Sequence, residues 1–271
     1  MKIAYTGWTW LVNHQDNHTW EFEQFLKEVA DLGYDEVENF AFIMDYFEGD
    51  AARVKALLEK YNLKMANLYQ HFSESDEEDL AKTKKFLPFM QAIGAKYLNL
   101  QAVMWNEAPL HRPLSKEDVL RYAKLSNEVG KLCKEAGVIA CFHPHAQTAV
   151  YTKESIEIFL ENTHPELVSL CLDTAHTAIA GIDVVSAFER WAHRIAYVHL
   201  KDVDPDLQKY QNPMHSFCEL GIGTIDFRGV VKTLRNTGYD GVLCVELDSR
   251  PVCNYKSAMI SRRYLHDALG L

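Results

Sequence analysis

Hydrophobic residues recur along the chain in one repeated arrangement: an amphipathic helical stretch leads through a turn residue into a short apolar run that ends in polar side chains. The apolar runs span residues 2–7, 36–40, 65–71, 97–102, 138–143, 168–173, 195–200 and 242–246. Their hydrophobicity is nearly continuous, which is typical of parallel strands that are buried on both faces. The pattern therefore predicts alternating strands and helices along the whole chain.

The stretches between these runs have the spacing of amphipathic helices. Residues 20–32, 51–61, 77–93, 116–136 and 227–237 carry apolar side chains three and four positions apart. Gly33, Gly94, Gly137 and Gly238 follow four of these stretches, where glycine can adopt the left-handed conformation that closes a helix. A structural role explains these glycines, so we assign them no function.

Strict alternation of strands and helices leaves two architectures, an open doubly wound sheet and a closed barrel. The repeated units fill residues 1–271 without a linker or a low-complexity tract, which favours a single (β/α)8 barrel domain. A dinucleotide-binding sheet would carry GxGxxG after its first strand, and this chain has Gly7-Trp8-Thr9-Trp10 there. We therefore predict an α/β fold of the TIM barrel type.

Composition and charge narrow the classes of partner. The formal charge of -10 disfavours binding to nucleic acids and to anionic membrane surfaces. Neither a signal peptide nor an apolar stretch long enough to span a membrane is expected. The 6 cysteines form no CxxC pair, which is typical of a reducing compartment. We expect a cytoplasmic protein that binds no membrane.

Polar residues stand at the ends of the predicted strands, where barrel enzymes build their active sites. A lone histidine at such a position is usually structural. Four consecutive strands, however, end in His143, Asp173, His199 and Glu246, and a barrel directs these ends towards one mouth. Imidazole and carboxylate together suit manganese, cobalt, iron or zinc better than calcium. The sequence predicts one divalent metal ion held by these four residues.

Five short motifs carry a resemblance to a known family. They are FHPH at 142–145, DTAH at 173–176, HLKD at 199–202, LGIGTIDF at 220–227 and VELD at 245–248. Together they resemble the xylose isomerase-like TIM barrel superfamily, which includes sugar isomerases and epimerases, inosose dehydratase and endonuclease IV. The resemblance implies one catalytic metal ion, and Asp173, His199 and Glu246 match the last three of its four ligands. His143 stands where the isomerases and epimerases have glutamate, and FHPH is similar to the histidine-rich stretch of inosose dehydratases.

The missing glutamate favours a lyase. Epimerases of this superfamily use two glutamates to remove and return a proton beside a carbonyl, whereas a dehydratase needs one base, a polarised ketone and an acid for the leaving hydroxyl. Candidate acids and bases are Glu246, His145, His176 and Lys201, with their individual roles left open. In the sugar-acting members of the superfamily the histidine of the DxxH motif contacts the substrate, and the resemblance implies the same role for His176. Lys201 could instead form a structural ion pair with Asp202 or Asp248.

Further strand-end residues could contact the substrate. Glu38 and His71 could bind sugar hydroxyls, and Gln101 ends the fourth strand. Trp8, Trp10 and Trp105 could stack on the apolar face of a ring or pack in the core. Arginine and glycine-rich turns are scarce at the strand ends, which favours a neutral keto-sugar or keto-inositol. Because Arg250 stands just beyond the eighth strand, a phosphorylated substrate stays an alternative.

Several alternatives stay open beside an inosose dehydratase-type lyase. A ketose 3-epimerase or a sugar (phosphate) isomerase would leave the mass of the substrate unchanged. DNA repair of the endonuclease IV type would need a further histidine where Gln101 stands and a DxH pair within 202–223, which this chain lacks. A metal-free binding barrel is the fourth alternative, because a fold alone does not establish activity. A homo-oligomer is compatible with all of them.

Overall fold

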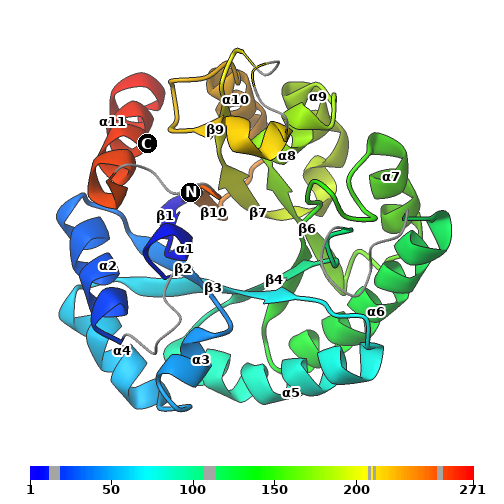
Figure 1. Cartoon of the computed structure of the whole chain (residues 1–271), viewed down its shortest axis with the longest axis horizontal. Helices are drawn as coiled ribbons and strands as arrows, with labels where there is room; N and C mark the ends of the chain where they lie inside the picture. The colour runs from blue at the N-terminus through cyan, green and yellow to red at the C-terminus, as the bar shows by residue number, and fades with distance from the viewer. Residues whose placement is uncertain (12–18, 106–113, 207–208, 210–211, 249–252) are drawn as a thin grey trace.

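The strands of the computed structural model close into a parallel barrel, shown in Figure 1. The structure describes residues 1–11, 19–105, 114–206, 209, 212–248 and 253–271. Around the barrel the strands run in the order β1 (Lys2–Thr6), β10 (Val242–Val245), β7 (Ile195–Leu200), β6 (Val168–Asp173), β5 (Ile139–Phe142), β4 (Tyr97–Gln101), β3 (Lys64–His71) and β2 (Glu36–Phe40). This closed eight-stranded barrel confirms the predicted fold, and each predicted strand matches an observed one to within one residue at either end.

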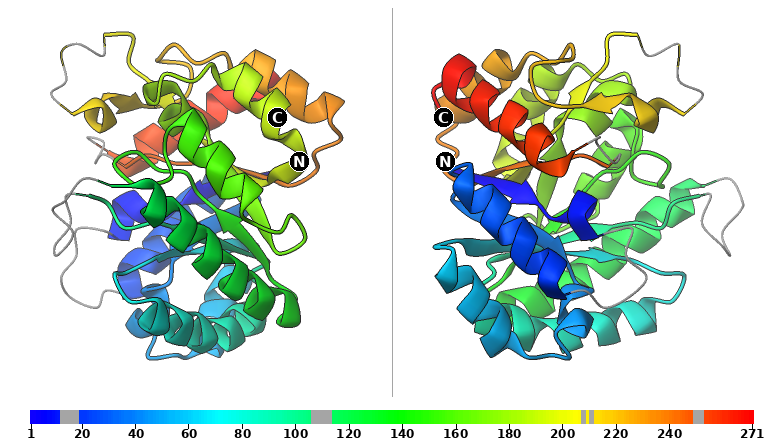
Figure 2. Two further views of the ribbon diagram at one scale, coloured as in Figure 1. Left: turned by 90° about the vertical axis from the view of Figure 1, so that its right-hand side faces the viewer. Right: turned by 60° about the vertical axis from the view of Figure 1, so that its left-hand side comes forward.

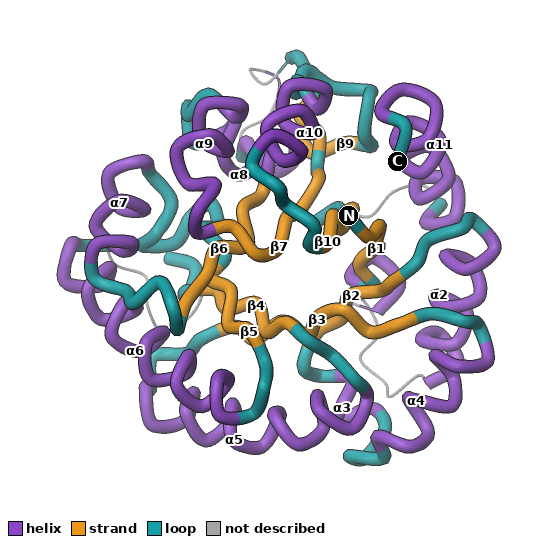
Figure 3. The backbone as a smooth tube through the Cα atoms, turned by 180° about the vertical axis from the view of Figure 1, so that it is seen from behind, coloured by secondary structure: helices purple, strands orange, loops and turns teal. Residues whose placement is uncertain are grey.

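Helices surround the barrel, as the view from behind in Figure 3 shows. The longer helices are α2 (Thr19–Asp31), α4 (Ala51–Lys60), α5 (Asp76–Ile93), α6 (Lys116–Glu135), α7 (Lys153–Glu161), α9 (Val184–Trp191), α10 (Phe227–Asn236) and α11 (Asn254–Leu269). Several begin at a side-chain cap, and Ser115 and Asp118 form a complete capping box at the start of α6. The predicted closing glycines, such as Gly94 at φ 78°, adopt the left-handed conformation. None of the described helices has the length and apolar character that crossing a membrane would require.

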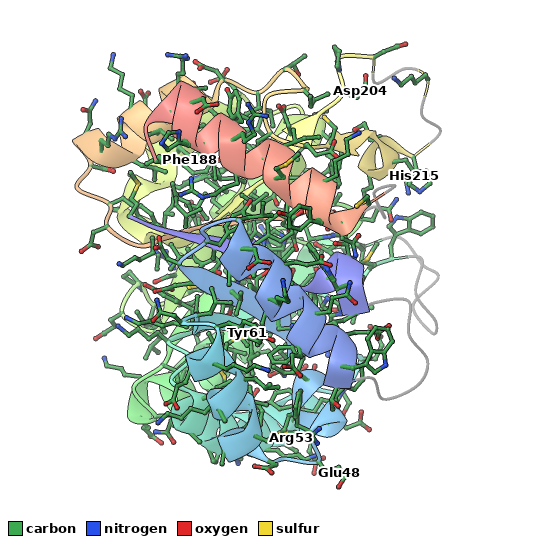
Figure 4. The ribbon with its side chains drawn as sticks, turned by 90° about the vertical axis from the view of Figure 1, so that its left-hand side faces the viewer. Glu48, Arg53, Tyr61, Phe188, Asp204 and His215 are labelled. Carbon is green, nitrogen blue, oxygen red and sulfur yellow. The ribbon has the colours of Figure 1, made fainter. Side chains whose placement is uncertain are left out.

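Short helices and a small hairpin lie at the carboxyl ends of the strands. The helices α1 (Trp8–Leu11), α3 (Ile43–Tyr46) and α8 (Thr174–Ile179) directly follow the strands or the first loop residues. After β7 come β8 (Asp202–Val203), a 3-10 helix at Pro213–Ser216 and β9 (Phe217–Cys218), and β8 pairs antiparallel with β9. Both side views in Figure 2 place this hairpin and α1 at the same end of the barrel, and Figure 4 labels Asp204 and His215 on the hairpin segment.

Asp202 fastens this hairpin segment to the barrel. Its carboxylate accepts four backbone N–H bonds, with donor distances between 2.9 and 3.1 Å. The donors are Val203, Gly221, Gly223 and Ile225. A Cβ atom at Gly223 would collide with the Val203 carbonyl and with Asp202 itself. The glycine-rich motif at 220–227 therefore stabilises the loop structure.

The barrel interior changes character along its axis. Near the amino ends of the strands it is filled by a cluster of small apolar residues, thiols and one tyrosine: Ala4, Ala66, Cys141, Cys171, Tyr197, Val242 and Cys244. Cys141, Cys171 and Cys244 are fully buried there, where their thiols pack as small hydrophobic groups. Polar side chains replace this packing towards the carboxyl ends. The barrel thus has an apolar floor beneath a polar mouth.

Candidate active site

The four proposed metal ligands meet inside the mouth of the barrel. Asp173 and His199 belong to β6 and β7, while His143 and Glu246 directly follow β5 and β10. One potential ligand atom from each side chain lies within 4.8 Å of those from the other three. All four residues are buried, with 4% or less of their surface exposed. The structure thus brings together the four residues that the strand-end pattern selects.

Hydrogen bonding fixes which nitrogen His143 presents to the cluster. Its Nδ1 lies 3.2 Å from the carbonyl oxygen of Cys171. Because a carbonyl oxygen can only accept, Nδ1 must carry the proton, which leaves a lone pair on Nε2. Burial and the neighbouring His199 lower the pKa of His143 well below its usual value. The ring is therefore neutral and able to bind a metal ion through Nε2.

His199 is oriented from the opposite side of the cluster. Its Nε2 lies 2.8 Å from Oε2 of Glu38, so that Nδ1 faces the carboxylates of Asp173 and Glu246 at 3.9 and 3.0 Å. A histidine that ligates a metal ion commonly bonds a carboxylate through its other nitrogen. The contact with Glu38 therefore gives His199 the arrangement of a metal ligand.

Two buried polar atoms of the cluster are left without hydrogen bonds, Oδ2 of Asp173 and Nδ1 of His199. The other oxygen of Asp173 accepts from the backbone N–H of His176 at 2.8 Å and caps α8. Burial raises the pKa of Asp173 to about 6. Leaving buried polar atoms without hydrogen bonds is costly. Here the charge of Lys201, 3.4 Å from Asp173, and the charge of Glu246, 3.0 Å from His199, partly offset that cost. A cation between them would satisfy both, so the residues fit a divalent metal ion, and the donor set suits manganese, cobalt, iron or zinc.

Lys201 lies beside the cluster and is fully buried. Its Nζ donates to Glu246 at 2.8 Å and to Asp248 at 2.9 Å, and it lies 3.4 Å from Asp173. Burial opposes the charged form, but these carboxylates raise the pKa of Lys201 well above its usual value. Lys201 is therefore an ammonium ion that balances acidic groups. Of the two ion pairs left open by the sequence, the structure contains the one with Asp248.

His145 and His176 pack against each other beside Lys201, with ring centroids 3.9 Å apart and ring planes tilted by 42°. Nδ1 of His176 accepts from the backbone N–H of Ala146 at 3.3 Å, so its proton is on Nε2, 3.5 Å from Asp248. Nδ1 of His145 lies 2.8 Å from the Ala146 carbonyl and must donate to it. Burial lowers the pKa of both rings. Both are neutral, and His145 keeps a lone pair on Nε2.

A cavity of about 210 Å³ opens above the cluster. It is lined by Trp8, Phe40, Tyr69, His71, Gln101, Met104, His145, Met214, Glu246 and Asp248. The predicted site residues among them are Trp8, His71, Gln101, His145 and Glu246. The aromatic and amide groups of this wall suit a ring that carries hydroxyl groups.

The wall also contains residues that the sequence analysis did not select. Tyr69 donates a hydrogen bond of 2.6 Å to Oε1 of Gln101. Tyr69 stands two positions before His71, and the alternation of side chains along a strand places both on the inner face. That alternation could have identified Tyr69. Met214 reaches the cavity from the hairpin segment, and no local sequence signal indicates this contact.

Other expected substrate contacts lie elsewhere. Glu38 is fully buried below the cavity, because it stands two positions deeper in β2 than Phe40, and it bonds His199 instead of a ligand. Trp10 is buried, contacts Tyr5 and donates to Glu28 at 2.8 Å, away from the cavity.

Trp105, a further predicted contact, does not line the cavity. The side chain of Trp105 is 47% exposed and lies outside the cavity lining, in which the preceding residue Met104 takes part. Arg250 lies outside the described residues. His176 and Lys201 are buried behind the cavity lining, so they reach a ligand only through their neighbours.

Known proteins resemble the chain in sequence and in fold. The family model described as xylose isomerase-like TIM barrel matches residues 26–265. An inosose dehydratase of Mesomycoplasma hyopneumoniae is 30% identical over 250 residues, covering 85% of this chain and 82% of that protein. An inosose dehydratase of Geobacillus kaustophilus is 29% identical over 268 residues, covering 90% and 86%.

Solved structures share the fold at lower identity. The IolI protein, solved with a binding zinc atom, superposes with a TM-score of 0.80 at 18% identity and covers 100% of this chain and 98% of its own. The probable 3-DHS dehydratase AsbF from Bacillus anthracis has a TM-score of 0.76 at 16% identity, with 98% of each chain covered.

Proposed function

Because the chain belongs to the xylose isomerase-like TIM barrel family, we propose that it is a divalent-metal-dependent dehydratase of the inosose dehydratase type. Its substrate would be a keto-inositol or a related keto-sugar. The observation that carries the proposal is the buried cluster of His143, Asp173, His199 and Glu246 at the base of a polyol-sized cavity. The inosose dehydratases that cover most of the chain support the same chemistry.

When bound at the cluster, a divalent metal ion would polarise the ketone oxygen of the substrate and stabilise the negative charge that develops there. Dehydration also requires a group that removes the proton from the carbon beside the ketone. His145 lines the cavity and keeps a lone pair on Nε2, so we assign this step to it. Glu246, which also lines the cavity, is the other candidate base.

The same proton can complete the elimination. As the C–H bond breaks, its electron pair forms the new double bond, and the C–O bond to the β-hydroxyl breaks on the next carbon. Protonated His145 returns the proton to the departing hydroxyl, which leaves as water. Atoms and charges then balance without a second acid.

Lys201 and His176 support these steps without touching the substrate. Lys201 offsets the negative charge of Glu246 and Asp248, which would otherwise repel the electron-rich substrate as the proton leaves. The ring of His176 packs against the ring of His145, and its Nε2–H points towards Asp248. These contacts hold the reactive ring of His145 in a fixed position.

An epimerase or isomerase is the second candidate, since the first steps are shared. His143 occupies the position where a glutamate would be needed for proton transfer on two faces, which favours the dehydratase. The proposal includes a metal ion that is manganese, cobalt, iron or zinc, a cytoplasmic location and compatibility with a homo-oligomer. These three points rest on the amino-acid sequence.

The test combines metal analysis with product analysis. Purified protein would be stripped of metal, reloaded separately with each of the four ions and incubated with keto-inositols, keto-glucosides and free ketoses. We expect stoichiometric metal and a product lighter by one water in mass spectrometry. A product of unchanged mass would assign the protein to the epimerases or isomerases. Failure to bind any of the ions would refute the proposal.

A further inference from the structure

Glu38 is a buried carboxylate whose partners come from three other strands. Its Oε2 accepts from Nε2 of His199 on β7 at 2.8 Å, from Nδ2 of Asn67 on β3 at 2.5 Å and from Nδ2 of Asn99 on β4 at 3.2 Å. No lysine or arginine in the described part of the chain forms an ion pair with it. Burying a carboxylate costs several kcal/mol unless hydrogen bonds stabilise it. Such a residue is poorly explained by packing alone.

The two asparagines brace Glu38 and each other. Oδ1 of Asn67 accepts from the backbone N–H of Asn99 at 3.0 Å, which fixes the orientation of the Asn67 amide. Nδ2 of Asn99 also donates to Sγ of Cys171 at 3.4 Å. Their NH2 groups both point at Oε2 of Glu38. An oxygen that already accepts two amide bonds has a defined position in the barrel. The third bond, to His199, is therefore made to a fixed point.

That bond determines what His199 can do. The ring has two nitrogens, and only the one that does not face Glu38 can point into the cluster with Asp173 and Glu246. A carboxylate on the distal N–H also makes the opposite nitrogen a stronger donor to a metal ion. Glu38 thus controls both the orientation and the donor strength of His199.

We propose that Glu38, braced by Asn67 and Asn99, is a positioning residue that selects Nδ1 of His199 as the ligating atom and so sets the metal affinity of the site. The proposal rests on the proposed metal site and concerns its regulation from inside the barrel. It assigns Glu38 a role towards the metal ion and none towards the substrate.

The test uses the full-length protein without bound metal and titrates it with Co²⁺, whose visible absorption reports both binding and coordination geometry. Glu38→Gln keeps the size and an oxygen acceptor but removes the charge. We expect its dissociation constant for Co²⁺ to rise roughly 10- to 100-fold, as for other residues that support a metal ligand. Imidazole nitrogen NMR of the Zn²⁺-loaded protein should show His199 bound only through Nδ1 in the wild type and through a mixture of nitrogens in the variant.

Asp79→Asn is the matched control. Asp79 is also fully buried and accepts a backbone N–H, from Ser73 at 2.7 Å, but it belongs to α5 and does not contact the cluster. Its Co²⁺ affinity should equal that of the wild type. If Glu38→Gln does not fold, Asn99→Ser removes the longer amide bond to Glu38, together with a bond to Sγ of Cys171, and should weaken Co²⁺ binding in the same direction.

The outcomes separate the two proposals. Wild-type affinity in folded Glu38→Gln, or in folded Asn99→Ser if the first variant is unfolded, overturns the role of Glu38 and leaves the proposed function intact. A wild-type protein that binds neither Co²⁺ nor Zn²⁺ overturns the proposed function itself. Weaker Co²⁺ binding together with a changed ligating nitrogen supports the positioning role.

Discussion

The two sides of the barrel mouth are built from different chemistry. On the ligand side, formed by His143, Asp173, His199, Lys201 and Glu246, every side chain is charged or carries a metal-binding nitrogen. On the wall side, aromatic rings and one amide line the cavity; Trp8 follows β1, and Phe40, Tyr69, His71 and Gln101 belong to β2, β3 and β4. The ligand side is suited to binding a metal ion and transferring protons, and the wall side is suited to binding a ring-shaped substrate.

The two sides are also held in place differently. Ligand-side residues are fixed by second hydrogen bonds, such as those from His143 to Cys171 and from His176 to Asp173. On the wall side, Trp8 packs on Phe40 with centroids 4.5 Å apart, and Tyr69 bonds Gln101. Changes on the ligand side should therefore abolish metal binding and turnover, whereas changes on the wall side should act mainly on substrate affinity.

The largest effect is expected from Asp173→Ala. The variant loses one of the four proposed ligands and leaves Glu246 as the only carboxylate beside Nδ1 of His199 in the described cluster, so metal should no longer be retained on gel filtration. Without it, dehydration should fall by about 1,000-fold, which corresponds to several kcal/mol of lost transition-state stabilisation. Elemental analysis and product mass spectrometry measure both quantities. Full metal content with normal turnover would contradict the assignment of Asp173.

Lys201→Met should give the next largest effect, and it should appear in stability. Removing the ammonium leaves the carboxylates of Glu246, which is buried, and Asp248, which is half-buried, without their counter-ion, and this should lower the free energy of unfolding by about 3–5 kcal/mol. Lys134→Met, which breaks an exposed pair with Glu166, is the control and should cost less than about 1 kcal/mol. Urea denaturation of the metal-free proteins compares them. Equal losses in the two variants would disprove the role of Lys201.

A smaller effect should follow from pH. Burial raises the pKa of Asp173 to about 6, so below that pH a metal ion must displace a proton from this carboxyl group. Metal affinity should be independent of this group above pH 6 and should fall by about tenfold per pH unit below it. Calorimetric titrations at several pH values measure the slope. An affinity that stays constant below pH 6 would show that Asp173 is not a ligand.

The smallest change is expected on the wall side. Tyr69→Phe leaves Oε1 of Gln101 without its donor, and kcat/KM should drop about tenfold, mostly through KM, with metal content unchanged. Trp105→Ala is the control, because this exposed residue lies outside the cavity lining, and its KM should stay within about twofold of the wild type. A loss of metal in Tyr69→Phe would show that the two sides are not separable.

The fold was predictable because parallel strands buried on both faces leave continuous apolar runs in a sequence. The ligand side was predictable for a related reason, since the carboxyl ends of barrel strands meet at one mouth. The residues of the wall side were harder to predict from the sequence. Trp8 and Trp10 stand two positions apart, and the sequence left both open as residues that stack on a ring or pack in the core; residues 8–11 form a helical turn. Positions two apart on a helix point in nearly opposite directions, which sends Trp8 to the cavity and Trp10 to the outer core.

The depth of a side chain along the barrel axis was the second property that could not be predicted from the sequence. The sequence shows that Glu38 lies near a strand end, but it does not show how many layers of side chains lie above it. The strands are offset along the barrel, and this offset arises from the pairing of neighbouring strands. Met214 depends on the path of a whole hairpin segment. Such placements come from tertiary packing, and local patterns do not contain them.

The fastening at Asp202 has a consequence for how this protein can evolve. Asp202 ties the base of the hairpin to Gly221 and Gly223 directly behind His199 and Lys201. This anchoring should keep changes in the length or sequence of the hairpin from displacing the proposed metal ligand His199 and its neighbour Lys201. Met214 of the hairpin segment still reaches the cavity. We therefore expect that substitutions in this segment can change substrate specificity without changing the type of reaction.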